Sequence, residues 1–110
     1  MKRLSPEMQR CIDQCLDCYR TCLTTLSQHC IEMGGAHTEA NHLRLLMACV
    51  EICRSSAHIM LTGTPAHREV CRACAAICRE CAQSCDRIKG MEDCAAACRR
   101  CAESCESMDA

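Results

Sequence analysis

The chain carries an unusual number of cysteines, whose thiolates are nucleophiles, redox groups and ligands for soft metal ions. Sixteen of its 110 residues are cysteine. Three stretches have the spacing C-x3-C-x2-C-x3-C, and a fourth has one C-x3-C pair. Steps of three and four residues return to one face of an α-helix, so each stretch predicts a helix with its sulfur atoms on one stripe. The cysteines are Cys11, Cys15, Cys18 and Cys22 in the first stretch, Cys49 and Cys53 in the second, Cys74, Cys78, Cys81 and Cys85 in the third, Cys94, Cys98, Cys101 and Cys105 in the fourth, and Cys30 and Cys71 outside these motifs.

Packing and disulfide formation are two possible roles for these stripes. Cysteine can act as a small apolar residue, but Leu or Ala would fill a core without the risk of oxidation. Residues four apart on a helix have Cβ atoms about 5–6 Å apart, whereas a disulfide needs about 3.5–4.5 Å. The seven C-x3-C pairs should therefore not close on themselves. Bridges between helices remain possible, which leaves a thiol redox or disulfide protein as an alternative.

Metal binding is the third possible role. Two thiolates one helical turn apart could hold a two-coordinate ion, and soft thiolate ligands select Cu(I). Facing pairs on neighbouring helices could instead supply the tetrahedron that Zn(II) requires, so a zinc-binding structural bundle is a second alternative. The spacing of Cys11, Cys15 and Cys18 also matches an iron–sulfur motif of enzymes that use S-adenosylmethionine, but here helical geometry alone produces it.

The number of thiols favours storage over transfer or sensing. A sensor needs one site with two or three ligands, whereas sixteen thiols that face one interior provide many sites with shared ligands. If each Cu(I) takes two sulfurs and each sulfur bridges two ions, the capacity approaches roughly one ion per cysteine. The sequence thus predicts storage or sequestration of many Cu(I) ions, with a role in detoxification.

Residues that begin and end helices divide the chain into four segments. Ser5 and Pro6 are typical of a helix start, and Thr64 with Pro65 repeats the pattern. Glycines follow the first three segments, where they favour breaks. Four helices joined by short turns predict one all-α domain, an antiparallel up-down four-helix bundle with a cysteine-lined core. The expected helices are 6–33, 38–62, 65–89 and 91–108, within a domain of residues 1–110.

Large apolar side chains are scarce, because the chain has no Phe, no Trp, one Tyr and sixteen Val, Leu and Ile together. Helix 38–62 is the exception, since its apolar residues extend beyond the cysteine stripe. A helix that is apolar on more than one side packs against more than one neighbour, so an oligomer interface is expected there. The residues concerned are Leu43, Leu45, Met47, Val50, Ile52, Ile59 and Leu61.

Charge and hydropathy argue against several partners and locations. A net charge of −1 with one aromatic residue gives nucleic acid no basic or stacking surface. Apolar runs are too short to span a membrane. The start, from Met1 to Glu7, lacks the apolar stretch of a secretory signal, so we expect a cytoplasmic protein with reduced thiols. No enzyme is predicted, because cysteine catalysis needs one activated thiol in a pocket.

The ends of the cysteine stripes carry other soft or borderline ligands. His29, Met33 and His42 should gather at one end of the bundle, where imidazole and thioether groups could receive Cu(I) before the thiolates do. His37 and His58 are expected at the surface.

The repeated motif resembles that of the bacterial copper storage proteins, four-helix bundles whose interior fills with Cu(I). The resemblance covers nearly the whole chain and implies a cytosolic homotetramer. It also implies that Cu(I) binds chiefly to cysteine pairs within one helix. The sequence departs from the pattern at helix 38–62, which has one pair only. The implied pairs are Cys11/Cys15, Cys18/Cys22, Cys49/Cys53, Cys74/Cys78, Cys81/Cys85, Cys94/Cys98 and Cys101/Cys105.

Overall fold

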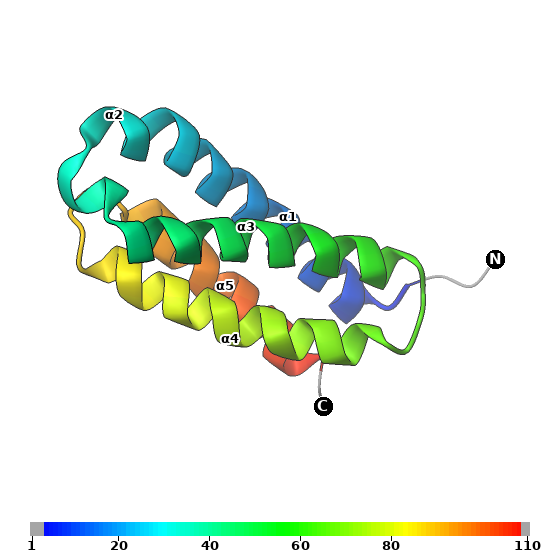
Figure 1. Cartoon of the computed structure of the whole chain (residues 1–110). Helices are drawn as coiled ribbons and strands as arrows, with labels where there is room; N and C mark the ends of the chain where they lie inside the picture. The colour runs from blue at the N-terminus through cyan, green and yellow to red at the C-terminus, as the bar shows by residue number, and fades with distance from the viewer. Residues whose placement is uncertain (1–3, 109–110) are drawn as a thin grey trace.

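Four long helices run up and down alongside one another in the computed structural model, which describes residues 4–108 (Figure 1). The predicted all-α, antiparallel up-down bundle with a cysteine-lined interior is confirmed. Residues 1–3, which include the charged start of the chain, and residues 109–110, at the end of the expected domain, lie outside the described part. The four helices are α1 (Pro6–Thr25), α3 (Ala40–Leu61), α4 (His67–Asp86) and α5 (Glu92–Ser107).

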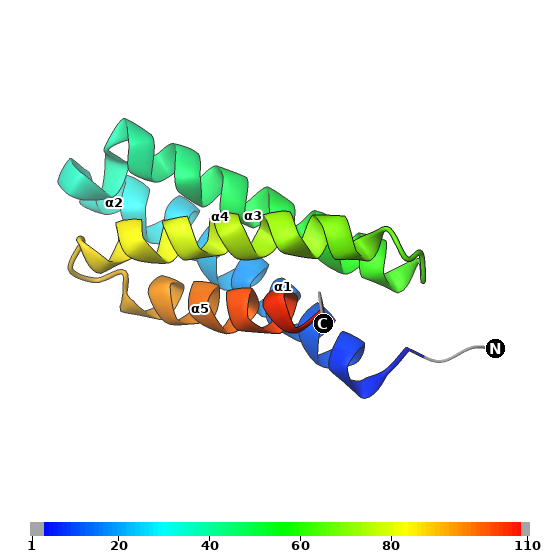
Figure 2. The ribbon, with the colours of Figure 1, turned by 90° about the horizontal axis from the view of Figure 1, so that it is seen from below.

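Each helix has two neighbours around the bundle. Helix α1 packs beside α3 and α5, and α4 packs beside the same two helices from the opposite side (Figure 2). Helices α1 and α4 therefore face each other across the interior, as do α3 and α5. This arrangement directs all four cysteine stripes toward one central axis.

Local interactions explain where the helices begin and end. The Ser5 hydroxyl accepts a hydrogen bond from the Met8 N–H at 3.1 Å, which caps α1. The Glu39 carboxylate accepts from the Asn41 N–H at 2.8 and 3.0 Å, so α3 begins at residue 40 rather than at the predicted 38. Gly34 has φ of 65°, in the left-handed region that ends helices. The predicted start at residue 6 and the predicted end at residue 33 match the structure, and the remaining boundaries differ from the observed ones by one to three residues.

The first predicted helix, 6–33, is interrupted by a π-helical turn. Residues Leu26–Cys30 form this turn, and a short helix α2 (Ile31–Met33) follows it. In a regular α-helix, a residue eight positions after Cys22 would lie about 80° round from the cysteine stripe. The wider π turn absorbs part of this rotation. Cys30 is consequently buried with the other cysteines.

Sulfur and small side chains make up most of the core. The largest fully buried side chains other than cysteine are Leu46, Met60 and Met91, and alanines fill the remaining contacts between helices. Among the described residues, no helix is both long and apolar enough to cross a membrane.

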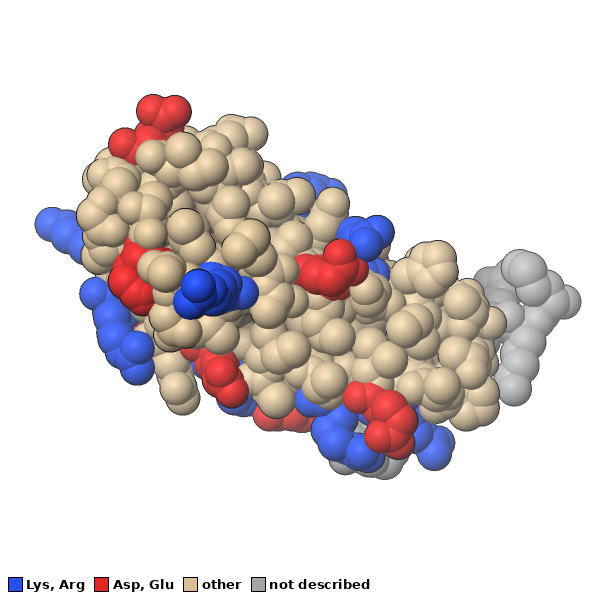
Figure 3. All heavy atoms as spheres, in the orientation of Figure 1, with Lys and Arg blue, Asp and Glu red and all other residues tan. Residues whose placement is uncertain are grey.

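Charged residues of both signs are interspersed on the face shown in Figure 3. Within residues 4–108, three ion pairs join neighbouring helices, and each is well exposed, so each contributes at most about 1 kcal/mol. They link Arg79 to Glu106, Arg99 to Asp86 and Arg100 to Asp17.

Candidate metal centre

All sixteen thiols lie inside the bundle, with relative exposures of 0% or 1%. This set includes Cys30 and Cys71, the two cysteines outside the C-x3-C pairs. Burial at every position follows from the spacing, because steps of three and four residues keep each stripe on the inner face of its helix. The interior is therefore a continuous column of potential soft ligands.

Neighbouring sulfur atoms are in van der Waals contact across the helices. The Sγ–Sγ distance is 3.5 Å for Cys53 and Cys78, which lie on α3 and α4. It is 3.6 Å for Cys15 and Cys101, on α1 and α5. Contacts also cross the diagonal, with 3.7 Å between Cys53 and Cys101 on α3 and α5. The sulfur atoms thus form one connected network along the bundle axis.

Within the described residues, five groups of cysteines place all their sulfur atoms within 4.8 Å of one another. Every group of four contains one C-x3-C pair and one cysteine from each of two other helices. The four pairs that take part come from the four different long helices. The groups are Cys15, Cys74, Cys101 and Cys105; Cys18, Cys49, Cys53 and Cys78; Cys18, Cys22, Cys49 and Cys98; Cys53, Cys74, Cys78 and Cys101; and the group of three, Cys11, Cys71 and Cys105.

The groups overlap, so most metal ions held in them would share ligands. Seven cysteines belong to two groups each, whereas Cys30, Cys81, Cys85 and Cys94 belong to none. Metal–sulfur bonds of about 2.3 Å span about 3.8 Å between ligands in a tetrahedron and about 4.6 Å in a linear site. The observed Sγ–Sγ distances of 3.5–3.9 Å suit three or four sulfurs around one ion. To bind an ion in linear geometry, two such sulfurs would have to move slightly apart.

Hydrogen bonds within the network divide the thiols into two kinds. Bonds from Cys22 and Cys85 lower the pKa of Cys94 to about 4, because they stabilise its thiolate. Bonds from Cys105 and Cys15 similarly lower the pKa of Cys101 to about 7. The pKa of Cys22 is raised, chiefly by its bond to Cys18. Some cysteines thus favour the anionic form that binds metal, while their neighbours remain proton donors.

Cys30 marks one end of the sulfur column. Its Sγ atom lies 3.5 Å from the Sδ atom of Met91, and both side chains are fully buried. Burial raises the pKa of the Cys30 thiol. A thiol and a thioether in contact form a soft donor pair between the cysteine groups and the histidines at this end of the bundle.

Three histidines close the same end. The rings of His29 and His37 meet edge to face with centroids 5.1 Å apart, and Nδ1 of His42 lies 2.8 Å from Oγ of Ser84. The expectation that His37 lies at the surface is wrong, because the 3-10 turn Gly35–Thr38 holds its ring at 7% exposure. One ring nitrogen on each histidine is buried without a hydrogen-bond partner: Nε2 of His29, Nδ1 of His37 and Nε2 of His42.

The structure does not bring Met33 into this cluster. Met33 ends the short helix α2 directly before Gly34, and 60% of its side chain is exposed. Met33 therefore lies at the surface and not among the buried groups at this end. His58 lies on the surface, as expected.

His42 should make the metal-free protein sensitive to acid. Burial lowers the pKa of His42 below its ordinary 6.5, so the unfolded chain takes up this proton at a higher pH than the folded chain. The contribution of His42 to the free energy of unfolding should be fully present above about pH 6.5. Below that pH the free energy of unfolding should fall by up to about 1.4 kcal/mol per pH unit, until the lowered pKa of His42 is reached. Urea unfolding of the reduced protein between pH 7.5 and 5 measures this loss.

The substitution His42→Gln should remove this dependence of the free energy of unfolding on pH. The matched control His58→Gln changes an exposed histidine and should leave the dependence as it is in the wild type. An unchanged profile in His42→Gln would show that another group is responsible.

Four antiparallel helices with a continuous interior of thiols define a class of protein built to bind soft metal ions. A family model described as copper storage protein matches residues 4–110. The chain belongs to this copper storage protein family.

Individual proteins show the same relationship. The uncharacterized cysteine-rich protein YhjQ of Bacillus subtilis is 35% identical over 79 residues, which cover 72% of each chain. The crystal structure of Nmul_A1745 from Nitrosospira multiformis superposes with a TM-score of 0.92 at 51% identity and covers 94% of both chains. The Cu(I)-bound copper storage protein BsCsp3 superposes with a TM-score of 0.86 at 34% identity, over 94% of this chain and 99% of that one.

Proposed function

We propose that this protein stores Cu(I), with many ions held per chain on the thiolates that line the bundle. The observation that carries the proposal is the overlap of the five cysteine groups. Shared ligands suit a cluster of many soft ions more than one isolated structural site, which needs four ligands only. All sixteen cysteines are proposed ligands, including Cys30 and Cys71.

The histidine end is proposed to receive the ions first. His29, His37 and His42 each direct one unpartnered nitrogen into buried space, and imidazole is an accepted ligand for copper. The soft pair of Cys30 and Met91 lies next along the axis. Met33 could contribute only from the surface, as an exposed thioether.

The protein is proposed to act by binding and not as an enzyme, as a cytoplasmic homo-oligomer, with a tetramer as the expected form. Reduced thiols require a reducing compartment. Apolar side chains exposed on α1 and α3 support self-association, since Leu23, Met47 and Leu61 are 38%, 56% and 59% exposed.

Anaerobic titration of the reduced protein with Cu(I) against a competing chelator tests the storage function. More than ten ions per chain are expected, on the basis of roughly one ion per cysteine. Tight binding of only one to four ions would contradict storage and would favour a zinc-type site. Rapid formation of interhelical disulfides in air, cycled by a reductase, would favour the redox alternative instead.

A further inference from the structure

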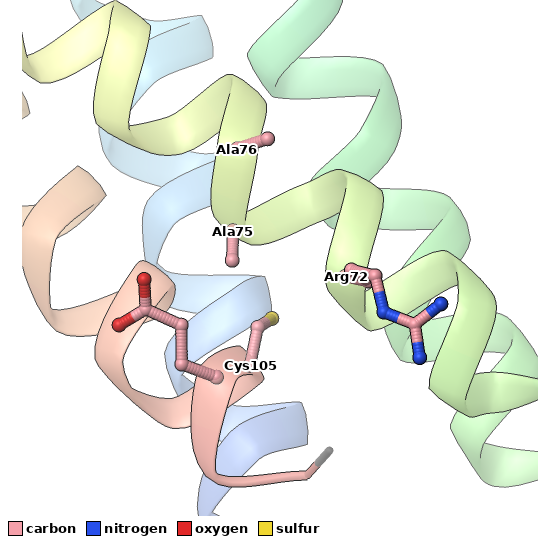
Figure 4. A pocket seen from close by; sticks show the side chains of 5 residues that line it. Arg72, Ala75, Ala76 and Cys105 are labelled. Carbon is pink, nitrogen blue, oxygen red and sulfur yellow. The ribbon is translucent and has the colours of Figure 1, made fainter.

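A pocket on the side of the bundle reaches one of the cysteine groups. It has a volume of about 290 Å³ and lies between α4 and α5, far from the histidine end. Its walls are Arg72, Ala75, Ala76, Cys105 and Glu106, and Figure 4 shows the side chain of Ala75 directed toward Cys105. Two of the five lining residues are alanines, whose side chains are single methyl groups. Only small side chains therefore separate the solvent from the sulfur column at this point.

Cys105 connects this pocket to the proposed metal sites. It belongs both to the group of three, with Cys11 and Cys71, and to a group of four. Its Sγ atom lies 3.7 Å from Sγ of Cys11 and 3.7 Å from Sγ of Cys15. A ligand that reached Cys105 would therefore contact ions held by either group.

An exposed ion pair borders the pocket. Arg79 donates to the Glu106 carboxylate at 2.6 and 3.0 Å and so joins α4 to α5. Cys105 itself is 0% exposed, so a ligand must displace part of the wall to reach its sulfur. The side chain of Glu106 is half exposed, and an ion pair of this kind is weak. Glu106 is consequently the lining residue whose side chain moves aside most easily.

Size and chemistry together identify the occupant. A volume of about 290 Å³ is at the lower limit for small-molecule sites and excludes a folded partner domain. Only a soft donor can compete with thiolate for Cu(I). Arg72 on the wall pairs with the Glu69 carboxylate at 3.0 Å, so its charge adds no third condition on the ligand. A small thiol meets both conditions, small size and a soft donor atom.

We propose that this pocket is an exchange port, through which a small thiol takes Cu(I) from Cys105. The inference rests on the proposed storage of Cu(I). In the exchange, the Cu(I)–sulfur bond to Cys105 breaks as a bond to the incoming sulfur forms, and the ion's remaining bond to a protein thiolate is replaced in the same way by a second small thiol. The proton of the incoming thiol passes to the Cys105 thiolate, and copper remains Cu(I) throughout. Release through this port is separate from uptake at the histidine end.

The test uses the full chain loaded anaerobically with Cu(I), with L-cysteine as the small thiol. A bulky disulfonated phenanthroline chelator traps the released ions and reports them by colour. The rate that depends on L-cysteine, normalised to the Cu(I) bound, is the readout. Ala76→Leu narrows the pocket and should slow this rate by about fivefold. Glu106→Ala removes the movable wall and should raise it by up to about fivefold, the factor that matches loss of one exposed ion pair.

Matched variants separate the port from general effects. Ala73→Leu places the same side chain on the exposed face of α4 outside the pocket. Asp86→Ala breaks a second ion pair between α4 and α5, that with Arg99. Both should exchange at the wild-type rate. If Ala76→Leu and Glu106→Ala match these controls, the port is excluded, whereas a capacity of only a few ions would contradict storage itself.

Discussion

Replacing Cys49 and Cys53 together by alanine should reduce the Cu(I) capacity by about three ions, although only two ligands are lost. Each sulfur in a shared network bridges two ions, and Cys49 and Cys53 share one group, so the two missing sulfurs break four metal–sulfur bonds to three ions. The two cysteines lie in three of the four groups of four. The variant should still fold, because loss of each of the two small buried groups costs about 1 kcal/mol. Anaerobic titration, with helix content checked by circular dichroism, measures both quantities.

The pair Cys81 and Cys85 offers a matched control, since it has the same spacing but belongs to none of the five groups. Its double alanine variant should lose fewer ions than the Cys49/Cys53 variant. Equal losses in the two variants would instead mean that Cu(I) binds to pairs within one helix and that the cross-helix groups have no special role.

Helical periodicity accounts for the part of this structure that could be predicted. The spacing of Cys94, Cys98, Cys101 and Cys105 places every sulfur on one face whatever the neighbouring helices do, so burial of these residues follows from the sequence. Glycine and proline positions located the turns between helices, and the observed helix ends depart from them by only a few residues.

The contacts between stripes could not be predicted, because they depend on how far each helix is shifted along its neighbours. Nothing in the local sequence indicates that Cys71 lies with Cys11 and Cys105, or that Cys53 contacts Cys78 at 3.5 Å. Cross-helix grouping therefore emerged only from the structure.

Two departures at the histidine end have local causes. The π turn that brings Cys30 inward has no sequence signal comparable to a glycine or proline. His37 lies in a glycine-containing segment, which suggests an exposed loop, but its 3-10 turn folds back over the bundle. The resulting cluster of three histidines with unpartnered nitrogens differs from the expected set of His29, Met33 and His42.

Loading with Cu(I) should raise the melting temperature by roughly 30 °C or more and leave the helix content unchanged. An ion that binds only the folded state contributes about 4 kcal/mol when present at a thousand times its dissociation constant. Three such ions would contribute about 12 kcal/mol, and each kcal/mol raises the melting temperature of a domain of this size by about 3–4 °C. Calorimetry of the metal-free and loaded protein under anaerobic conditions measures the difference.

The metal-free protein should nevertheless be folded, because Leu46, Met60 and Met91 are fully buried between helices that are rich in alanine. A zinc-binding structural bundle would behave in the opposite way, since removal of its metal by a chelator would unfold it. A metal-free chain that is unfolded at 25 °C would therefore contradict the storage function, because a storage protein must remain folded after it has released its ions. The Cys49/Cys53 variant should show a smaller rise on loading, in proportion to the ions it has lost.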